Sequence, residues 1–66
     1  MVDFDGLMEG SFVSTEASGD RWYEVLDWVE NSDHEITYLF VRDLVSYELE
    51  QLRADKVLRF DTGEDD

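Results

Sequence analysis

His34 is the only histidine of the chain and the first residue to consider for acid–base chemistry. It stands between Asp33 and Glu35, so a carboxylate lies on either side of the imidazole in the sequence. Hydrolytic catalysis places such a base beside a nucleophile, but Ser11 and Ser14 have no histidine near them in the sequence. The pattern favours a solvent-facing turn residue at position 34. We assign no catalytic residue and expect the chain not to be an enzyme.

Acidic residues near the N-terminus raise the possibility of a metal site. Asp3, Asp5 and Gly6 have the spacing that begins a calcium-binding loop, but the remaining ligands and the closing glutamate of an EF-hand do not follow. The chain has no cysteine and one histidine, which excludes a thiolate site or a multi-histidine zinc site within a single chain. We therefore expect no metal ion and no cofactor.

A dense group of aromatic residues in the stretch GDRWYEVLDWVEN, residues 19–31, is the main functional lead. Alternate residues of a β-strand point to opposite faces of the sheet. One parity contains the better core candidates: Tyr23, Val25 and Val29. The other parity forms a candidate partner-binding face: Trp22, Leu26 and Trp28.

Two interpretations of this second face stay open. In the first, a short helix covers it through Leu49 and Leu52. In the second, Trp22 and Trp28 stay partly exposed and anchor a protein partner, because tryptophan is enriched among the residues that dominate protein interfaces. A second copy of the chain would be the simplest partner, since a chain this small gains most from sharing a core.

Charge is the most unusual property of the composition. The 66 residues include 18 acidic and 5 basic side chains, one of them a lysine, for a formal net charge of -13. An acidic surface with few lysines resembles the proteins of halophilic archaea, in whose salt-rich cytoplasm the repulsion between carboxylates is screened. A protein that mimics nucleic acid and an ordinary acidic protein are the alternatives. Disorder is disfavoured, because 42% of the residues are hydrophobic and 14% aromatic.

The elements that must position these residues are mostly strands. Turn-forming residues separate runs of β-branched, aromatic and alternating apolar residues. The residues without β-branches after position 46 favour a short helix. The predicted order is strands over 11–15, 21–30, 35–41 and 44–46, a helix over about 47–55, and a closing strand over 57–60.

The stretch from Gly19 to Leu26, followed by an acidic turn and then Glu35-Ile36-Thr37-Tyr38, resembles the SH3-like small β-barrels. The resemblance covers about residues 10–52. It implies an antiparallel SH3-like barrel or meander, here of α+β class, mostly β, with the short helix near residues 47–55. Modules of this kind mostly bind peptides, nucleic acid or neighbouring domains through aromatic surfaces, and seldom catalyse.

The sequence thus predicts one small domain over residues 1–66, with flexible tails at 1–5 and 61–66. It has neither a signal peptide nor an apolar run long enough to span a bilayer, so we expect a cytoplasmic protein without membrane contact. The expected function is a small interaction module of a halophile with an unidentified protein partner. The alternative is a regulator that binds or mimics nucleic acid. Direct binding is disfavoured by the acidic loop residues Glu30, Asp33 and Glu35.

Overall fold

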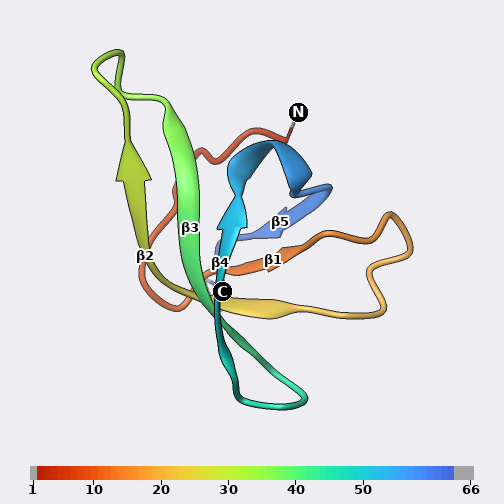
Figure 1. Ribbon diagram of the computed structural model, residues 1–66. Helices are drawn as coiled ribbons and strands as arrows, with labels where there is room; N and C mark the ends of the chain where they lie inside the picture. The colour runs from red at the N-terminus through yellow and green to blue at the C-terminus, as the bar shows by residue number, and fades with distance from the viewer. Residues whose placement is uncertain (1, 64–66) are drawn as a thin grey trace.

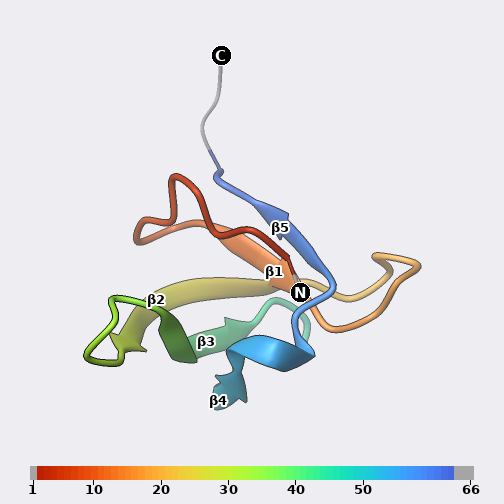
Figure 2. The ribbon, with the colours of Figure 1, turned by 90° about the horizontal axis from the view of Figure 1, so that it is seen from above.

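Runs of β-branched and aromatic residues form the strands of the computed structural model, which describes residues 2–63 (Figure 1). The strands are β1 (Phe12–Ser14), β2 (Tyr23–Glu30), β3 (Ile36–Asp43), β4 (Leu49–Arg53) and β5 (Arg59–Asp61). They form one antiparallel sheet with the order β4-β3-β2-β1-β5. The prediction of a mostly-β antiparallel fold is confirmed. The last strand crosses from the β4 edge to the far edge and pairs with β1 (Figure 2).

The long β2–β3 hairpin is closed by a turn over residues 31–35. The side-chain Oδ1 of Asn31 accepts hydrogen bonds from the backbone N–H of Asp33 at 2.9 Å and of Glu35 at 3.0 Å. His34 has a left-handed backbone, with φ of 64°. Asparagine substitutes for a backbone acceptor in such turns, which explains why the strand stops at Glu30 and resumes at Ile36.

A β-bulge interrupts the pairing of β2 with β3. Val25 lies opposite Val41, but the next paired residue, opposite Phe40, is Asp27. Leu26 is therefore the extra residue of β2. One additional residue shifts the register by one, so the side chains after the bulge exchange faces relative to simple alternation.

The bulge overturns the predicted alternation of β2. Trp28 lies opposite the fully buried Leu39 and packs against the core, whereas Val29 is 42% exposed. The prediction that Val29 shares the core face with Tyr23, and that Trp28 shares the opposite face with Trp22, is wrong. Alternation counted along one strand cannot reveal a bulge, because a bulge is defined by the pairing with the neighbouring strand.

The core lies on one side of the sheet, which we call the inner face. Its buried side chains come from β1, β2, β3 and the segment before β5: Val13, Tyr23, Val25, Leu39, Val41 and Val57. Partly buried side chains surround them, including Phe4 of the N-terminal segment and Phe60 of β5. The rings of these two phenylalanines meet edge to face, with centroids 5.6 Å apart. The segments at the two ends of the described chain thus help to cover the same core.

The predicted helix over residues 47–55 is wrong. Residues Leu49–Arg53 form strand β4, which pairs with β3 from Arg42 opposite Leu49 to Tyr38 opposite Arg53. Only a 3-10 turn, η1 (Ala54–Lys56), follows it. The segment predicted as a strand at 44–46 is instead the turn that joins β3 to β4. Pairing with the open edge of β3 outweighs the modest helix propensity of this stretch.

The predicted tails fall partly within the described residues. Val2 and Phe4 pack against the core, and Asp61 pairs with Phe12 across the β1–β5 ladder. Residues 64–66 lie outside the described part of the chain. The flexibility of the two ends stays a prediction.

Candidate interaction surface

One row of side chains crosses all five strands on the side away from the core. Directly opposed residues in antiparallel strands point to the same face. The pairings therefore place the following side chains together on what we call the outer face: Asp61, Phe12, Glu24, Arg42 and Leu49. Within this row, Arg42 and Glu24 form an ion pair with 3.9 Å between Nη1 and Oε1.

Apolar side chains extend the outer face along β3 and its neighbours. Phe40 and Tyr38 have the same parity as Arg42, and Val29 lies opposite Tyr38. Their exposed fractions are 38%, 39% and 42%, and Leu49 reaches 71%. Tyr38 and Phe40 point away from the buried Leu39 and Val41, so β3 carries large apolar residues on both sides. An apolar sheet face open to solvent marks a contact surface more often than an isolated exposed residue does.

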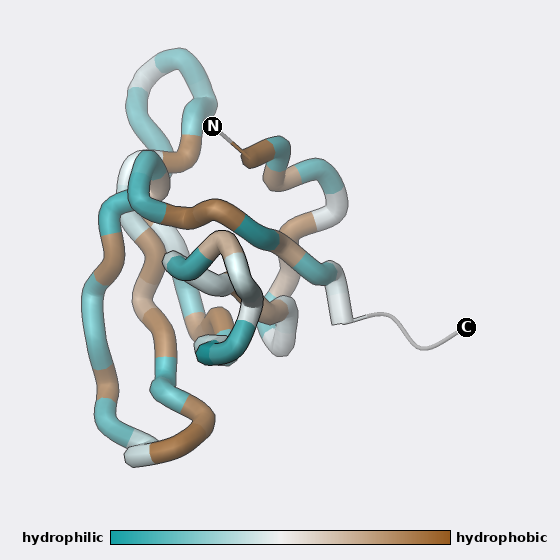
Figure 3. Tube along the Cα trace, turned by 90° about the vertical axis from the view of Figure 1, so that its right-hand side faces the viewer, coloured by the Kyte–Doolittle hydropathy of each residue, from teal (hydrophilic) through white to brown (hydrophobic). Residues whose placement is uncertain are grey.

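The outer face is hollowed near β1. Phe12, Trp22, Leu44 and Asp61 line a hollow of about 310 Å³. Trp22 precedes Glu24 by two residues and Leu44 follows Arg42 by two, which continues the parity of the outer face. The backbone N–H of Leu44 donates to the carbonyl oxygen of Trp22 at 3.4 Å, which joins two walls of the hollow. Figure 3 shows hydrophobic residues at the β3–β4 turn that supplies Leu44, the lowest part of the molecule in Figure 1.

Asp43 fixes the conformation of that turn. Its side chain is fully buried, and its Oδ1 accepts hydrogen bonds from the backbone N–H of Val45 at 2.7 Å and of Ser46 at 3.2 Å. Tyr47 completes the turn with a left-handed φ of 61°, and its N–H donates to the Asp43 carbonyl at 2.8 Å. The position of Leu44, and with it one wall of the hollow, therefore depends on this carboxylate.

Arg21 compensates the buried charge. Its Nε donates to Asp43 Oδ2 at 3.0 Å, and its Nη2 donates to the same oxygen. The guanidinium also lies 5.7 Å from the centroid of the Tyr23 ring. The Val45 N–H first, and then the hydrogen bond from Arg21, hold the pKa of Asp43 below its ordinary value. This ion pair was not predicted, although an aspartate before a turn is a known capping signal.

The structure separates the three residues predicted to bind a partner. Trp22 is half-buried and lines the hollow of the outer face. Trp28 packs against the core, and its indole Nε1 donates to Glu30 Oε1 at 3.3 Å. Leu26 occupies the bulge and is half-buried. The partner-binding role of these residues stays a prediction, but Trp22 and Trp28 do not form one contact surface.

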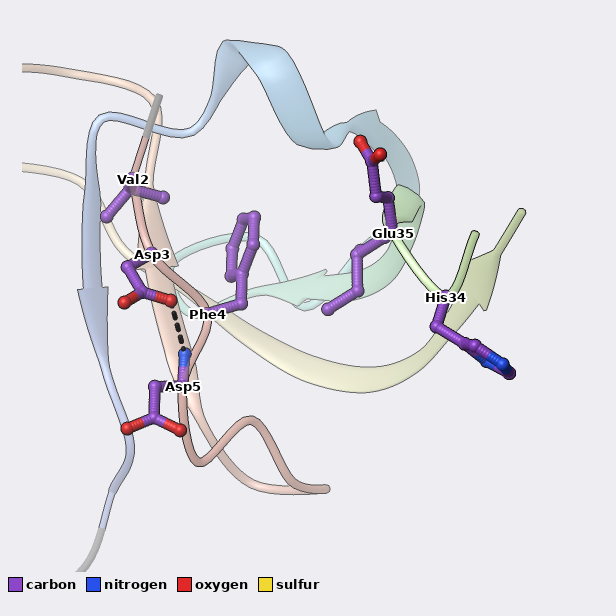
Figure 4. Close-up of a pocket in the computed structure, with 7 residues that line it drawn as sticks. Val2, Asp3, Phe4, Asp5, His34 and Glu35 are labelled. Carbon is purple, nitrogen blue, oxygen red and sulfur yellow. Dashed lines mark hydrogen bonds between the residues drawn. The ribbon is translucent and has the colours of Figure 1, made fainter. Parts of the chain in front are cut away.

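A second hollow, of about 420 Å³, lies between the N-terminal segment and the β2–β3 turn (Figure 4). Figure 4 shows that Asp3 and Asp5 line one side, where Asp3 Oδ1 accepts a hydrogen bond from Asp5 N at 3.1 Å. The His34 side chain points away from them and is 90% exposed. Its nearest carboxylate is that of Glu30, with 3.6 Å between Nδ1 and Oε2. The imidazole is therefore a solvent-facing group of the turn.

Within residues 2–63, no group of three or more histidine, aspartate or glutamate side chains is arranged to hold a metal ion. The same part of the chain contains no helix that is long and apolar enough to cross a membrane. Comparison of the sequence with protein-family models and curated proteins, and of the fold with solved structures, finds no match. The interpretation of the outer face therefore depends on its own chemistry.

Proposed function

We propose that this protein is a non-enzymatic interaction module that binds a positively charged protein through the outer face of its sheet. The observation that carries the proposal is the exposure of Val29, Tyr38, Phe40 and Leu49 on a face whose opposite side already holds the core. These residues have no role in the core, and aromatic side chains are typical anchors of protein interfaces.

The charge of the chain supports the choice of partner. A net charge of -13 repels a second copy of the chain and other acidic proteins, and it attracts basic surfaces. The proposal includes a cytoplasmic setting in a salt-accumulating organism, where the repulsion within the domain is screened over about 3 Å at 1 M salt. Apolar contacts persist in such a medium, so the outer face supplies affinity where long-range attraction is weak.

We further propose that the sheet belongs to the SH3-like small barrels. The support is the strand order, in which the last strand returns to pair with the first. Between β4 and β5 the chain crosses from one edge of the sheet to the other, and Val57 of this crossing joins the core, which favours a sheet that curls around its inner face. The bulge at Leu26 adds the local bend that such curling needs.

The test compares proteins captured from a lysate of the source organism by three tagged chains, with and without nuclease treatment, over a series of potassium chloride concentrations that extends to the multi-molar range. The chains are the wild type, the double variant Phe40→Ser with Leu49→Ser, and the control Val45→Ser. Val45 is 77% exposed but lies in the β3–β4 turn rather than on the strands of the outer face. Circular dichroism verifies that each variant is folded.

We expect a basic protein that the wild type and Val45→Ser retain equally and that the double variant loses at least about tenfold. Equal capture by all three chains would refute binding through the outer face. Capture that disappears with nuclease would instead support the alternative of a regulator that binds nucleic acid. Capture that depends on salt but not on Phe40 would support mimicry of nucleic acid by the carboxylates.

A further inference from the structure

The hollow lined by Phe12, Trp22, Leu44 and Asp61 combines three apolar walls with one carboxylate. Its volume of about 310 Å³ is at the lower end of ligand pockets, which suits one long side chain rather than a cofactor. The carboxylate restricts what that side chain is. A purely apolar group placed over Asp61 would remove an unpaired charge from water, which is unfavourable.

The guanidinium groups of the four arginines in the described chain are engaged elsewhere. Asp61 takes part in none of the ion pairs within residues 2–63. The guanidinium of Arg42, in the same row of the outer face, pairs with Glu24. Arg59, two residues before Asp61, donates its Nε to the carbonyl oxygen of Ala17 in the β1–β2 loop. Asp61 Oδ1 accepts a hydrogen bond from Gly63 N at 2.9 Å, which holds the carboxylate in place.

We propose that this hollow is a binding site for an arginine side chain of the basic partner. The methylene stem lies against Leu44, the planar guanidinium stacks on the aromatic walls of Phe12 and Trp22, and its N–H groups donate to Asp61. Guanidinium is weakly hydrated, stacks on aromatic rings and pairs with carboxylates in a planar geometry, so it matches all four walls better than an ammonium does. This site rests on the proposed function, because it supplies the specificity of the same outer face.

The two tryptophans give a direct probe of the site. Trp22 lines the hollow, whereas Trp28 packs against the core on the inner face, so their indole N–H signals in a proton–nitrogen NMR spectrum report on opposite faces. The titrants are the capped peptide Gly-Ser-Arg-Ser-Gly and the same peptide with citrulline or norleucine at the centre. Citrulline preserves the shape of arginine without its charge, and norleucine preserves only an apolar stem.

The variants separate a specific ion pair from general attraction to an acidic protein. Asp61→Asn removes the carboxylate but keeps an oxygen that accepts from Gly63 N. Asp27→Asn is the matched control, because Asp27 pairs opposite Phe40 on the outer face and its Oδ1 likewise accepts a local backbone hydrogen bond, from Trp28 N at 2.8 Å. Both variants remove one negative charge, so they reduce the net negative charge by the same amount.

We expect the arginine peptide to shift the Trp22 signal and to leave the Trp28 signal unchanged. Binding should weaken about fivefold with citrulline and in Asp61→Asn, and less than about twofold in Asp27→Asn. Equal losses in the two variants, shifts spread over the acidic surface, or no shift of Trp22 would overturn the site. If norleucine binds at Trp22 as well as arginine does, the arginine site fails while the proposed interaction module stands. The arginine site and the interaction module both fail under two joint conditions. No peptide shifts the Trp22 signal, and the double variant Phe40→Ser with Leu49→Ser captures the same proteins as the wild type.

Discussion

Strand β3 lies between two turns, and each turn is capped by a side-chain oxygen that accepts backbone hydrogen bonds. The capping side chain is a neutral amide in one turn and a charged carboxylate in the other. At one end the Asn31 side chain accepts two hydrogen bonds from the following backbone, and at the other end the Asp43 side chain does the same. Each turn also contains a residue other than glycine in the left-handed region, His34 in the first and Tyr47 in the second. The turns at the two ends of the strand thus share the same kind of side-chain cap and the same left-handed backbone conformation.

The difference lies in the surroundings of the two caps. Asn31 is exposed, and a neutral amide suffices because water solvates whatever the turn leaves unpaired. Asp43 is fully buried, and its charge is compatible with burial only because Arg21 pairs with it. The ion pair connects the β3–β4 turn to the start of β2, next to Trp22. One turn therefore closes a hairpin, whereas the other also shapes the hollow of the outer face.

The largest expected effect is that of Asp43→Asn. The amide keeps an oxygen for the turn but presents an N–H group to the guanidinium of Arg21, which leaves a cation without its partner. We expect the largest drop in melting temperature of any single change in either turn, together with altered Trp22 and Leu44 signals in NMR spectra. A melting temperature within one degree or so of the wild type would show that the buried pair does not stabilise the fold.

The reciprocal change, Asn31→Asp, is the control for that comparison. The carboxylate of the variant accepts the same two backbone hydrogen bonds in an exposed turn, so we expect a change below about 0.5 kcal/mol in the free energy of unfolding. Urea unfolding measures both variants on the same scale. If the two substitutions lower the free energy of unfolding by the same amount, the burial of Asp43 would not make its turn more sensitive than that of Asn31.

Acid should weaken the β3–β4 turn, whose cap is the carboxylate of Asp43, but not the cap of the β2–β3 turn, which is the neutral amide of Asn31. The pKa of Asp43 is lowered in the folded protein, so its contribution to stability is complete above the ordinary aspartate pKa of about 3.9 and is lost as the pH falls toward the lowered pKa. The other carboxylates are common to the wild type and to Asp43→Asn, so the comparison isolates the carboxylate of Asp43. We therefore expect the difference in unfolding free energy between these proteins to shrink from about pH 6 to about pH 3. A difference that is constant over this range would contradict the lowered pKa.

The smallest expected effects concern the left-handed residues. Tyr47→Gly should stabilise the protein by about 0.5–1 kcal/mol, because glycine adopts a positive φ without strain and the Tyr47 side chain is largely exposed. His34→Gly should stabilise the protein by less than about 0.5 kcal/mol, since histidine tolerates the left-handed region of backbone conformation better than most residues do. Denaturant unfolding tests the order of the two effects. Destabilisation by Tyr47→Gly would show that the ring contributes a contact that outweighs the strain.

The predictability of the fold differs between its two halves. Strands β1, β2 and β3 follow from β-branched and aromatic runs bounded by turn residues, and the structure places them close to the predicted ranges. The closing strand predicted over 57–60 overlaps β5 (Arg59–Asp61), whereas residues 44–55 do not follow from local sequence. Leu49–Arg53 is compatible with a helix until β3 offers an unpaired edge, and that edge is a property of the assembled sheet.

The candidate surface was predictable only in part. Trp22 is identified by its residue type, but the other walls of its hollow come from β1, β5 and the turn after β3, which no sequence spacing brings together. The exposed Tyr38 and Phe40 did have a signal, since β3 is apolar at both parities. Arg21 and Asp43 are 22 residues apart, and nothing in their immediate neighbours distinguishes this pair from other charges of the chain.

The pairing of β1 with β5 has a consequence for the order in which the protein folds. Ser11 Oγ donates to the carbonyl oxygen of Thr62, 51 residues later, and Val13 pairs with Phe60. Strands β2, β3 and β4 follow one another in the chain and can associate early, whereas the pairing of β1 with β5 must close a much longer loop. Until residues 57–62 dock, β1 lacks a neighbour on one side and the core lacks Val57, so the partly folded chain exposes apolar surface.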